Sequence, residues 1–272
     1  MAKEKRTIVG SPLTPEMLLQ IGAVSDFSSD EKAFNPAEEW TNRYRIWTCH
    51  GYRESGNLDV GYLQIQRNPA DSDKRFELQV LQEVKNEGGT LNRVTAKIDC
   101  MEDGLSYPVK WSYTSIFLNV DGKEDKSLTV NIQGQSSDSE IMWTRNGIVS
   151  KLTCKGRPSC DWCVYETVQR RAKQFFGSRT FDMLEGLERF KPSQQLLDRG
   201  RVDVELGGST RRLHRIDQIG TGVLPFEYWI DESFRLCLMA SMNKVYILDH
   251  QSGPDINDGQ MNTAEIARRE LK

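Results

Sequence analysis

Short segments in which apolar and polar residues alternate are the feature that most constrains the fold of this chain. They occupy residues 44–49, 58–66, 75–84 and 91–100, and turn signals separate them. Alternation gives a strand one apolar and one polar face, as in an antiparallel sheet with one face in solvent, whereas parallel sheets covered on both faces give continuous apolar runs. With turns this frequent, the pattern predicts an antiparallel meander.

The C-terminal part of the chain continues this pattern. Residues 220–249 contain three apolar segments, and the polar tetrads 231–234 and 241–244 separate them. We interpret the run as three strands joined by tight turns. The run contains no cluster of nucleophiles or metal ligands, so it indicates a surface for binding rather than for chemistry. The predicted fold class is mainly β, with a curved antiparallel sheet in the form of a half-barrel or open barrel.

A helical insert is predicted between the two groups of strands. Residues 161–176 carry apolar side chains at three-to-four spacing, with Asp161 near the N-terminal cap and Gly177 as a stop signal. A second short helix is expected at 181–190, ended by Pro192. Thr14 could cap another short helix near the start of the chain. The predicted organisation is an N-terminal extension at 1–40, a β-rich half-barrel domain at 41–250 with the helical insert at 159–190 packed against the sheet, and a C-terminal tail at 251–272.

Composition narrows the class of protein. The 272 residues are 38% hydrophobic and 28% charged, which is typical of a soluble globular protein with a sizeable core. The formal net charge is only −3, and the basic runs at 170–173 and 211–215 are short, so no nucleic-acid partner is expected.

No window of the sequence approaches the ~20 apolar residues of a membrane span. The first residues lack the apolar core of a secretory signal. We therefore expect a periplasmic or secreted protein if a signal has been removed ahead of Met1, and a cytoplasmic one otherwise.

The cysteines leave several chemistries open. The six thiols could form three disulfides in an oxidising compartment, and reduced, buried thiols fit a chain of this size equally well. Three of the six, Cys154, Cys160 and Cys163, lie within ten residues. They could form a disulfide clamp or stay inert, they could bind zinc with a fourth ligand from elsewhere in the chain, or Cys160 and Cys163 could be redox-active at a helix start. The sequence alone does not support naming a metal site.

Other candidate chemistry is weak, and strand aromatics are the better signal. The three histidines lie far apart, acidic pairs such as Asp231 and Glu232 lie in turns, and the glycines at 207–208 are too sparse to cradle a phosphate. We therefore predict no catalytic residues, no metal ligands and no cofactor. Aromatic side chains on strands usually pack in a core, but on a concave sheet face they would line an apolar pocket. The candidate ligand-binding residues are Trp47, Tyr62, Trp111, Tyr113, Trp143, Tyr228 and Trp229.

Four segments together carry a resemblance to a known group. Residues 44–117, 181–187, 220–231 and 245–249 resemble uncharacterised bacterial proteins related to the lipoprotein-carrier half-barrel superfamily, over the region 41–250. The resemblance implies a curved antiparallel sheet wrapped around helices, an apolar cavity, residence outside the cytoplasm and no catalysis. The chain differs from that group in its cysteine-rich loop, its long N-terminal extension and the missing signal peptide.

The functional prediction is a non-enzymatic binding or carrier protein that holds an apolar small molecule or lipid in the concave face of the sheet. Peripheral contact with a membrane is left open, as is the oligomeric state. One alternative is a hydrolase or lyase acting on a polymer, with acids or His214 brought together across the sheet. The other is a structural interaction module that uses the two ends of the chain for its contacts.

Overall fold

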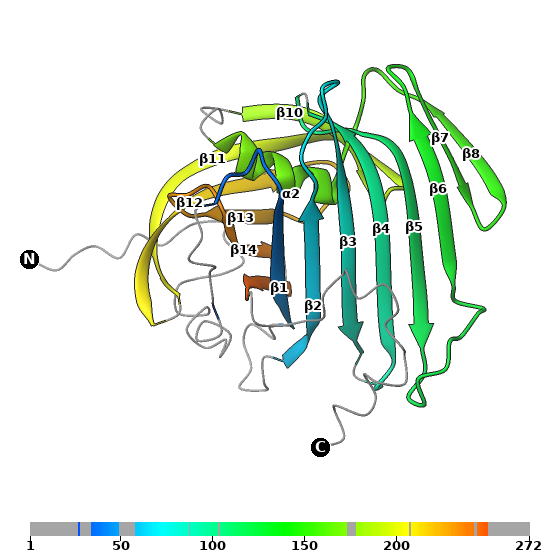
Figure 1. The fold of residues 1–272 in the computed structure, drawn as a ribbon, viewed down its shortest axis with the longest axis horizontal. Coiled ribbons are helices and arrows are strands. Elements are labelled where there is room, and N and C mark those ends of the chain that lie inside the picture. Colours follow the sequence, from blue (N-terminus) through cyan, green and yellow to red (C-terminus); the bar gives the residue numbers. More distant parts are fainter. Residues whose placement is uncertain are drawn as a thin grey trace, which may run out of the picture.

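The computed structural model describes residue 27 and residues 34–48, 58–86, 88–102, 104–172, 178–206, 208–241 and 244–249. These residues form one 15-stranded sheet and one helix, α2, which spans Asp161–Arg170 (Figure 1). The sheet is curved and open, as the sequence predicts. The expected helix near Thr14, most of the N-terminal extension and the whole C-terminal tail lie outside the described residues.

The first eight strands form a meander in which each strand pairs with the next. Their bounds are β1 Trp40–Thr48, β2 Leu58–Arg67, β3 Arg75–Lys85, β4 Leu91–Met101, β5 Pro108–Leu118, β6 Val130–Ser136, β7 Glu140–Arg145 and β8 Ile148–Thr153. The remaining strands form a second run of neighbours. They are β9 Ser159–Cys160, β10 Ser178–Glu185, β11 Arg189–Leu206, β12 Ser209–Ile219, β13 Phe226–Ile230, β14 Leu236–Ser241 and β15 Lys244–Leu248, where β9 is the short strand directly before α2.

The two runs join at β1 and β15, which pair antiparallel in the middle of the sheet. The edge strands β8 and β9 are therefore the furthest apart in strand order, although only residues 154–158 separate them in the chain. In a flat sheet with strands ~4.8 Å apart they would lie about 65 Å from each other. The connecting chain spans at most about 20 Å. The sheet must therefore curl until its two ends approach, which produces the spiral seen in Figure 1.

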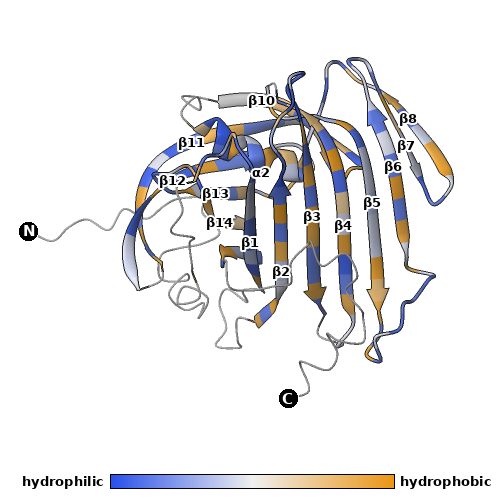
Figure 2. Ribbon diagram, viewed as in Figure 1, coloured by the Kyte–Doolittle hydropathy of each residue, from blue (hydrophilic) through white to orange (hydrophobic). Residues whose placement is uncertain are grey.

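The alternating sequence pattern becomes a two-faced sheet. In β3, Phe76, Leu78 and Val80 are buried, and the residues between them are less so. Figure 2 shows apolar and polar residues alternating along β2, β3 and β4 in the same way. Helix α2 lies inside the curl (Figure 1), and its buried side chains belong to the same hydrophobic core as Phe76, Leu78 and Val80. The hydrophobic core therefore fills the space between the concave face and the helix.

The predicted second helix at 181–190 is wrong. These residues form the end of β10, a turn, and the start of β11. Gly186 and Leu187 have φ angles of 57° and 62°, in the left-handed region that interrupts a helix. Pairing of β10 with β9 and β11 outweighs the local helix propensity. Pro192 lies inside β11, near a register shift where a missing backbone donor is tolerated.

The insert at 159–190 thus contains one ten-residue helix rather than two helices. This helix starts at Asp161, as predicted, but Cys160 is its N-cap and Arg171 its C-cap. The sequence predicts a helix that continues to residue 176. The helix ends at Arg170, with Arg171 as its C-cap, and residues 173–177 lie outside the described part of the chain.

A buried charge network fixes α2 to the sheet. The Arg67 guanidinium of β2 is fully buried and donates from Nε to Glu166 Oε1 on the helix at 3.2 Å and from Nη2 to Glu102 Oε1 at 2.7 Å. Its Nη1 donates to the backbone carbonyls of Ala37 and Glu38 at 2.7 and 2.9 Å. Glu166 also accepts a hydrogen bond from Arg170 Nε at 2.6 Å. Each buried charge therefore has several partners, which offsets its loss of hydration.

Candidate ligand-binding cavity

A cavity of about 480 Å³ lies between α2 and the C-terminal half of the sheet. We call it the helix cavity. Its walls come from the first turns of α2, from β10, β12, β13 and β15, and from the loop before β13. The lining residues are Gln82, Asp161, Trp162, Tyr165, Met183, Glu185, Gln218, Gly222, Val223, Leu224, Phe226, Tyr228, Ser241, Lys244 and Tyr246. This volume lies in the range of small-molecule sites, ~300–1,000 Å³.

An aromatic cluster forms one side of the helix cavity. The ring centroid of Phe226 lies 5.8 Å from that of Tyr165, 5.0 Å from that of Tyr228 and 6.4 Å from that of Tyr246. Tyr165 comes from the helix, and the other three come from β13 and β15. Rings at these separations attract each other and present a large, rigid apolar surface. The cluster therefore supplies the wall that an apolar ligand requires.

Burial keeps the tyrosine hydroxyls of this cluster neutral. It raises the pKa of Tyr246 to about 12, and it raises the pKa values of Tyr165 and Tyr228 well above the ordinary value for tyrosine. The Tyr228 hydroxyl donates a hydrogen bond to Gln218 Oε1 at 2.6 Å. The aromatic wall therefore carries no charge at neutral pH.

Asp161 contributes a carboxyl with a raised pKa to the helix cavity. Burial, with a smaller contribution from the neighbouring charge of Glu185, raises the pKa of this carboxyl to about 6. The backbone N–H of Gly186 donates to Asp161 Oδ2 at 2.6 Å and lowers the pKa, but by less than burial raises it. The carboxyl is therefore protonated at mildly acidic pH and ionised at neutral pH.

We expect Asp161→Asn to change how stability depends on pH. The raised pKa means that the folded wild type binds a proton between about pH 4 and pH 6 that the unfolded chain has lost, so its stability falls as the pH rises through this window. The asparagine variant does not lose stability in this window. Its free energy of unfolding should exceed that of the wild type by on the order of 2–3 kcal/mol at pH 7 and differ little at pH 4. Urea unfolding at both pH values measures the difference. An equal difference at pH 4 and pH 7 would contradict the assignment.

The structure brings one of the seven candidate aromatic residues, Tyr228, into the wall of the helix cavity. Tyr113 lies just beyond it, with its ring stacked on Trp162 at a centroid distance of 6.3 Å. Trp111 and Trp143 pair with the same residue, Gly134, from either side in the sheet. Cross-strand partners share a face, so these two tryptophans form a row on the concave face with Tyr113.

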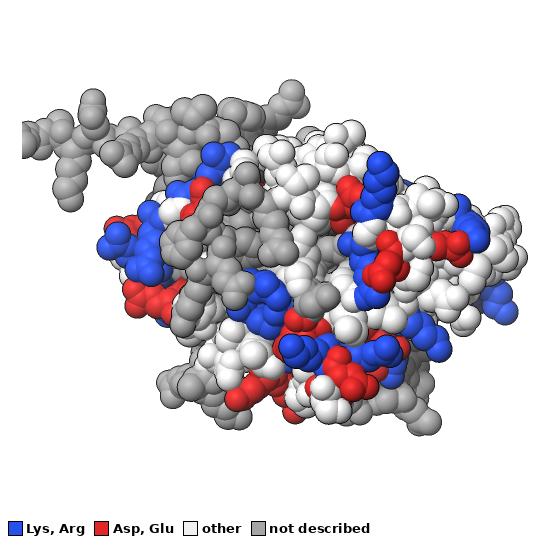
Figure 3. Space-filling view, turned by 90° about the horizontal axis from the view of Figure 1, so that it is seen from above, with Lys and Arg blue, Asp and Glu red and all other residues white. Residues whose placement is uncertain are grey.

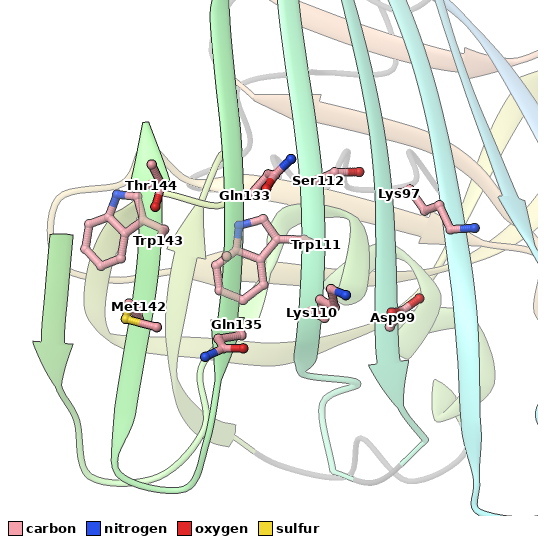
Figure 4. A pocket seen from close by; sticks show the side chains of 11 residues that line it. Lys97, Asp99, Lys110, Trp111, Ser112, Gln133, Gln135, Met142, Trp143 and Thr144 are labelled. Atoms are coloured by element: carbon pink, nitrogen blue, oxygen red, sulfur yellow. The ribbon is translucent and has the colours of Figure 1, made fainter. Parts of the chain in front are cut away.

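Trp111 and Trp143 contribute to a second depression, of about 450 Å³, along β4–β7. Figure 4 shows its side chains, most of which are polar: Lys97, Asp99, Lys110, Ser112, Gln133, Gln135 and Thr144 accompany Met142 and the two tryptophans. Lys110 and Ser112 flank Trp111 in β5 and so project from the opposite face of the sheet. A polar lining on a solvated strand face is a poorer match to an apolar ligand than the helix cavity.

The other three candidate residues do not line the helix cavity. Trp229 is only 1% exposed and follows Tyr228 directly, so it points to the other face, where its Nε1 lies 3.3 Å from Glu227 Oε2. Tyr62 pairs with Arg45 and Glu83, and burial raises its pKa. Trp47 is partly buried and follows a register shift in β1. Whether any of the seven residues contacts a ligand stays a prediction.

The candidate set from the sequence does not include Trp162, Tyr165, Phe226 and Tyr246, which also line the helix cavity. The first two belong to the helix predicted at 161–176 and are buried on it, and a helix face against a curved sheet can also border a cavity. Phe226 and Tyr228 alternate in one strand, so they share a face. That spacing was the available signal for adding Phe226 and for separating Tyr228 from Trp229.

The described cysteines are all free thiols: Cys100, Cys154, Cys160, Cys163 and Cys237. Cys49 lies outside the described residues. Within the part of the chain that the structure describes, no group of three or more His, Cys, Asp or Glu side chains is arranged to hold a metal ion. His214, proposed above as a catalytic group, lies 2.7 Å from Asp198 Oδ1 through Nε2, and neither residue lines the helix cavity.

The visible surface carries charges of both signs. On the face shown in Figure 3, Lys and Arg residues lie beside Asp and Glu residues rather than in a patch of one sign. Opposite charges also pair among the described residues, as Lys97 Nζ does with Glu77 Oε2 at 2.6 Å. Among the described residues, no helix has the length and apolarity that crossing a bilayer requires.

These features define a β-barrel-like protein with an open, curved antiparallel sheet around one helix. A crystal structure titled as a β-barrel-like protein of a domain of unknown function, DUF1849, from Brucella abortus has a similar fold. The two share 10% sequence identity, with a TM-score of 0.52 over 78% of this chain and 95% of that one. At this identity the likeness concerns the fold alone. No protein-family model matches the chain, and no curated protein matches it.

Proposed function

We propose that this protein is a non-enzymatic binding or carrier protein that holds an apolar small molecule or lipid chain in the helix cavity. The observation that carries the proposal is the aromatic wall of Tyr165, Phe226, Tyr228 and Tyr246, packed around a space large enough for a ligand. A relation to the lipoprotein-carrier half-barrels is part of the same proposal, and a curved open sheet around a helix supports it.

The polar groups of the helix cavity suit orientation of a ligand better than catalysis. Gln82, Gln218 and Ser241 offer hydrogen bonds, and Asp161 and Lys244 offer charges of opposite sign. A few polar groups among apolar ones is the usual composition of a small-molecule site. In the hydrolase or lyase alternative the reacting groups are acids or His214. The His214–Asp198 pair lies among β11 and β12, away from the lining, so the form of that alternative that uses His214 is not supported at this cavity.

Native mass spectrometry of protein purified without detergent, before and after organic extraction, is the direct test. We expect an extra mass that extraction releases and that identifies the class of ligand. If the protein carries no extra mass and also fails to bind an added apolar probe, N-phenyl-1-naphthylamine, the proposal is wrong.

Phe226→Ala should weaken binding of the same probe about tenfold, because an aromatic contact contributes ~0.5–1.5 kcal/mol beyond its buried area. Phe226 is only partly buried, so the variant is expected to fold. Leu128→Ala is a matched control, because Leu128 is 50% exposed and does not line the helix cavity. Fluorescence titration of both variants measures the dissociation constants. Equal affinities in the wild type and Phe226→Ala would place the probe elsewhere.

A further inference from the structure

Three thiols meet at the start of α2, two from the helix start and one from the distant strand β4. Cys160 Sγ lies 3.0 Å from Cys163 Sγ, and Cys163 Sγ lies 3.5 Å from Cys100 Sγ on β4. All three side chains are completely buried. Cys160 is the N-cap of the helix, and its sulfur accepts a hydrogen bond from the backbone N–H of Cys163 at 3.4 Å. This hydrogen bond helps to keep the Cys160 sulfur beside the Cys163 sulfur.

We infer that Cys160 and Cys163 form a redox site, which closes to a disulfide when the protein meets a disulfide-type oxidant. A disulfide has an S–S distance of about 2.05 Å, so the two sulfurs need to approach by only about 1 Å. Rotation of the two side chains supplies this movement, because both residues belong to the same helical turn and the backbone already brings the sulfurs together.

The reaction balances with one external disulfide. The S–H bonds of Cys160 and Cys163 break, one S–S bond forms between them, and the two electrons and two protons reduce the S–S bond of the oxidant to two thiols. Burial raises the pKa values of both thiols well above the ordinary value. Because the thiolate is the reactive form, exchange in the folded protein is slow, and a disulfide once formed is protected from reduction.

The position of the pair connects it with the helix cavity. The two residues between the cysteines, Asp161 and Trp162, both line that cavity. A disulfide across this turn would fix the backbone that carries them. Ligand affinity should therefore differ between the oxidised and reduced protein. This effect on affinity rests on the proposed function, whereas the disulfide itself does not.

Peptide mapping of the full chain tests the disulfide. The folded protein is oxidised with oxidised glutathione, unfolded, and alkylated with N-ethylmaleimide. We expect two of the six cysteines to escape alkylation. After tryptic digestion, the peptide of residues 156–170 should carry both of them and weigh about 2 Da less than its unalkylated dithiol form. Alkylation of all six thiols, a glutathione adduct, or a cross-link from Cys100 to Cys163 would overturn the inference.

Variants separate the site from its neighbours. Cys163→Ser should abolish the pair of cysteines that escapes alkylation, whereas Cys100→Ser should keep it. Cys237→Ser is a control that should also keep it, because Cys237 is buried on β14 and donates a hydrogen bond to the Arg235 carbonyl. If Cys163→Ser does not fold, the wild-type peptide map still decides the question. Titration of N-phenyl-1-naphthylamine into both redox states tests the link to the helix cavity. Equal affinities would overturn the link and leave the disulfide, and no binding in either state would refute the proposed function alone.

Discussion

Arg67→Ala is expected to destabilise the protein by about 3–5 kcal/mol, because it leaves Glu166 buried without its partner on the sheet. Arg67 and Glu166 are both fully buried, so water cannot replace the lost interaction. The same change removes donors from Glu102 and from the backbone carbonyls of residues 37 and 38. Urea denaturation followed by circular dichroism measures the loss.

Lys97→Ala is the matched control for this prediction. The Lys97–Glu77 ion pair is shorter, at 2.6 Å against 3.2 Å for Arg67–Glu166, but the lysine side chain is 61% exposed. Exposed pairs contribute at most about 1 kcal/mol. A similar loss of stability in both variants would show that burial does not decide the energy of these pairs. Arg67→Met combined with Glu166→Met should recover part of the loss, because it removes both fully buried charges, although Glu102 and Arg170 each lose one partner.

Gly61→Ala is expected to cost about 3 kcal/mol or more, through a steric clash in the middle of the sheet. Gly61 has a φ of 148°, and a Cβ at this position would lie 1.9 Å from the backbone carbonyl oxygen of Glu83 on β3. Backbone atoms cannot rotate away as a side chain can, so β2 and β3 must separate locally. In urea denaturation, the midpoint concentration of the Gly61→Ala variant should be lower than that of the wild type.

Alanine substitutions at two other glycines distinguish the cost of the steric clash from the cost of the backbone conformation. Gly147 has a φ of 86° but open space around its Cβ position, so alanine there should cost only about 1 kcal/mol. Gly88 has neither a positive φ nor a close neighbour, and Gly88→Ala should be nearly neutral. If Gly61→Ala costs no more than Gly147→Ala, the close contact with Glu83 is not what selects glycine.

The sequence predicted the parts of the fold that depend on local pattern. Alternation in β2 to β5 shows which side chains share a face, because the period of two is fixed by the strand itself. The segment at 181–190 was mistaken for a helix because its short apolar pattern fits either period, and its partners on β9 and β11 decide between them. Such partners are not visible in a single sequence.

The candidate site was less predictable for the same reason. The approach of Cys100 to Cys163 joins β4 to α2 across 63 residues, and no spacing rule indicates it. The seven predicted aromatics were chosen by residue type without separating the two sheet faces. Tyr228 and Trp229 are adjacent in one strand and cannot both line one cavity, so the alternation itself could have divided the set.

The short connection at residues 154–158 has a consequence for how a ligand could leave. While this connection is intact, the two edge strands β8 and β9 cannot move apart. Release of a ligand from the helix cavity would therefore need motion near α2 and the loop before β13. Lys155 in this connection is exposed to solvent, where a protease can reach it. A single cut there would leave every strand ladder intact and free the two edges. Under the proposed function, the cut protein should therefore exchange its ligand faster than the intact protein does.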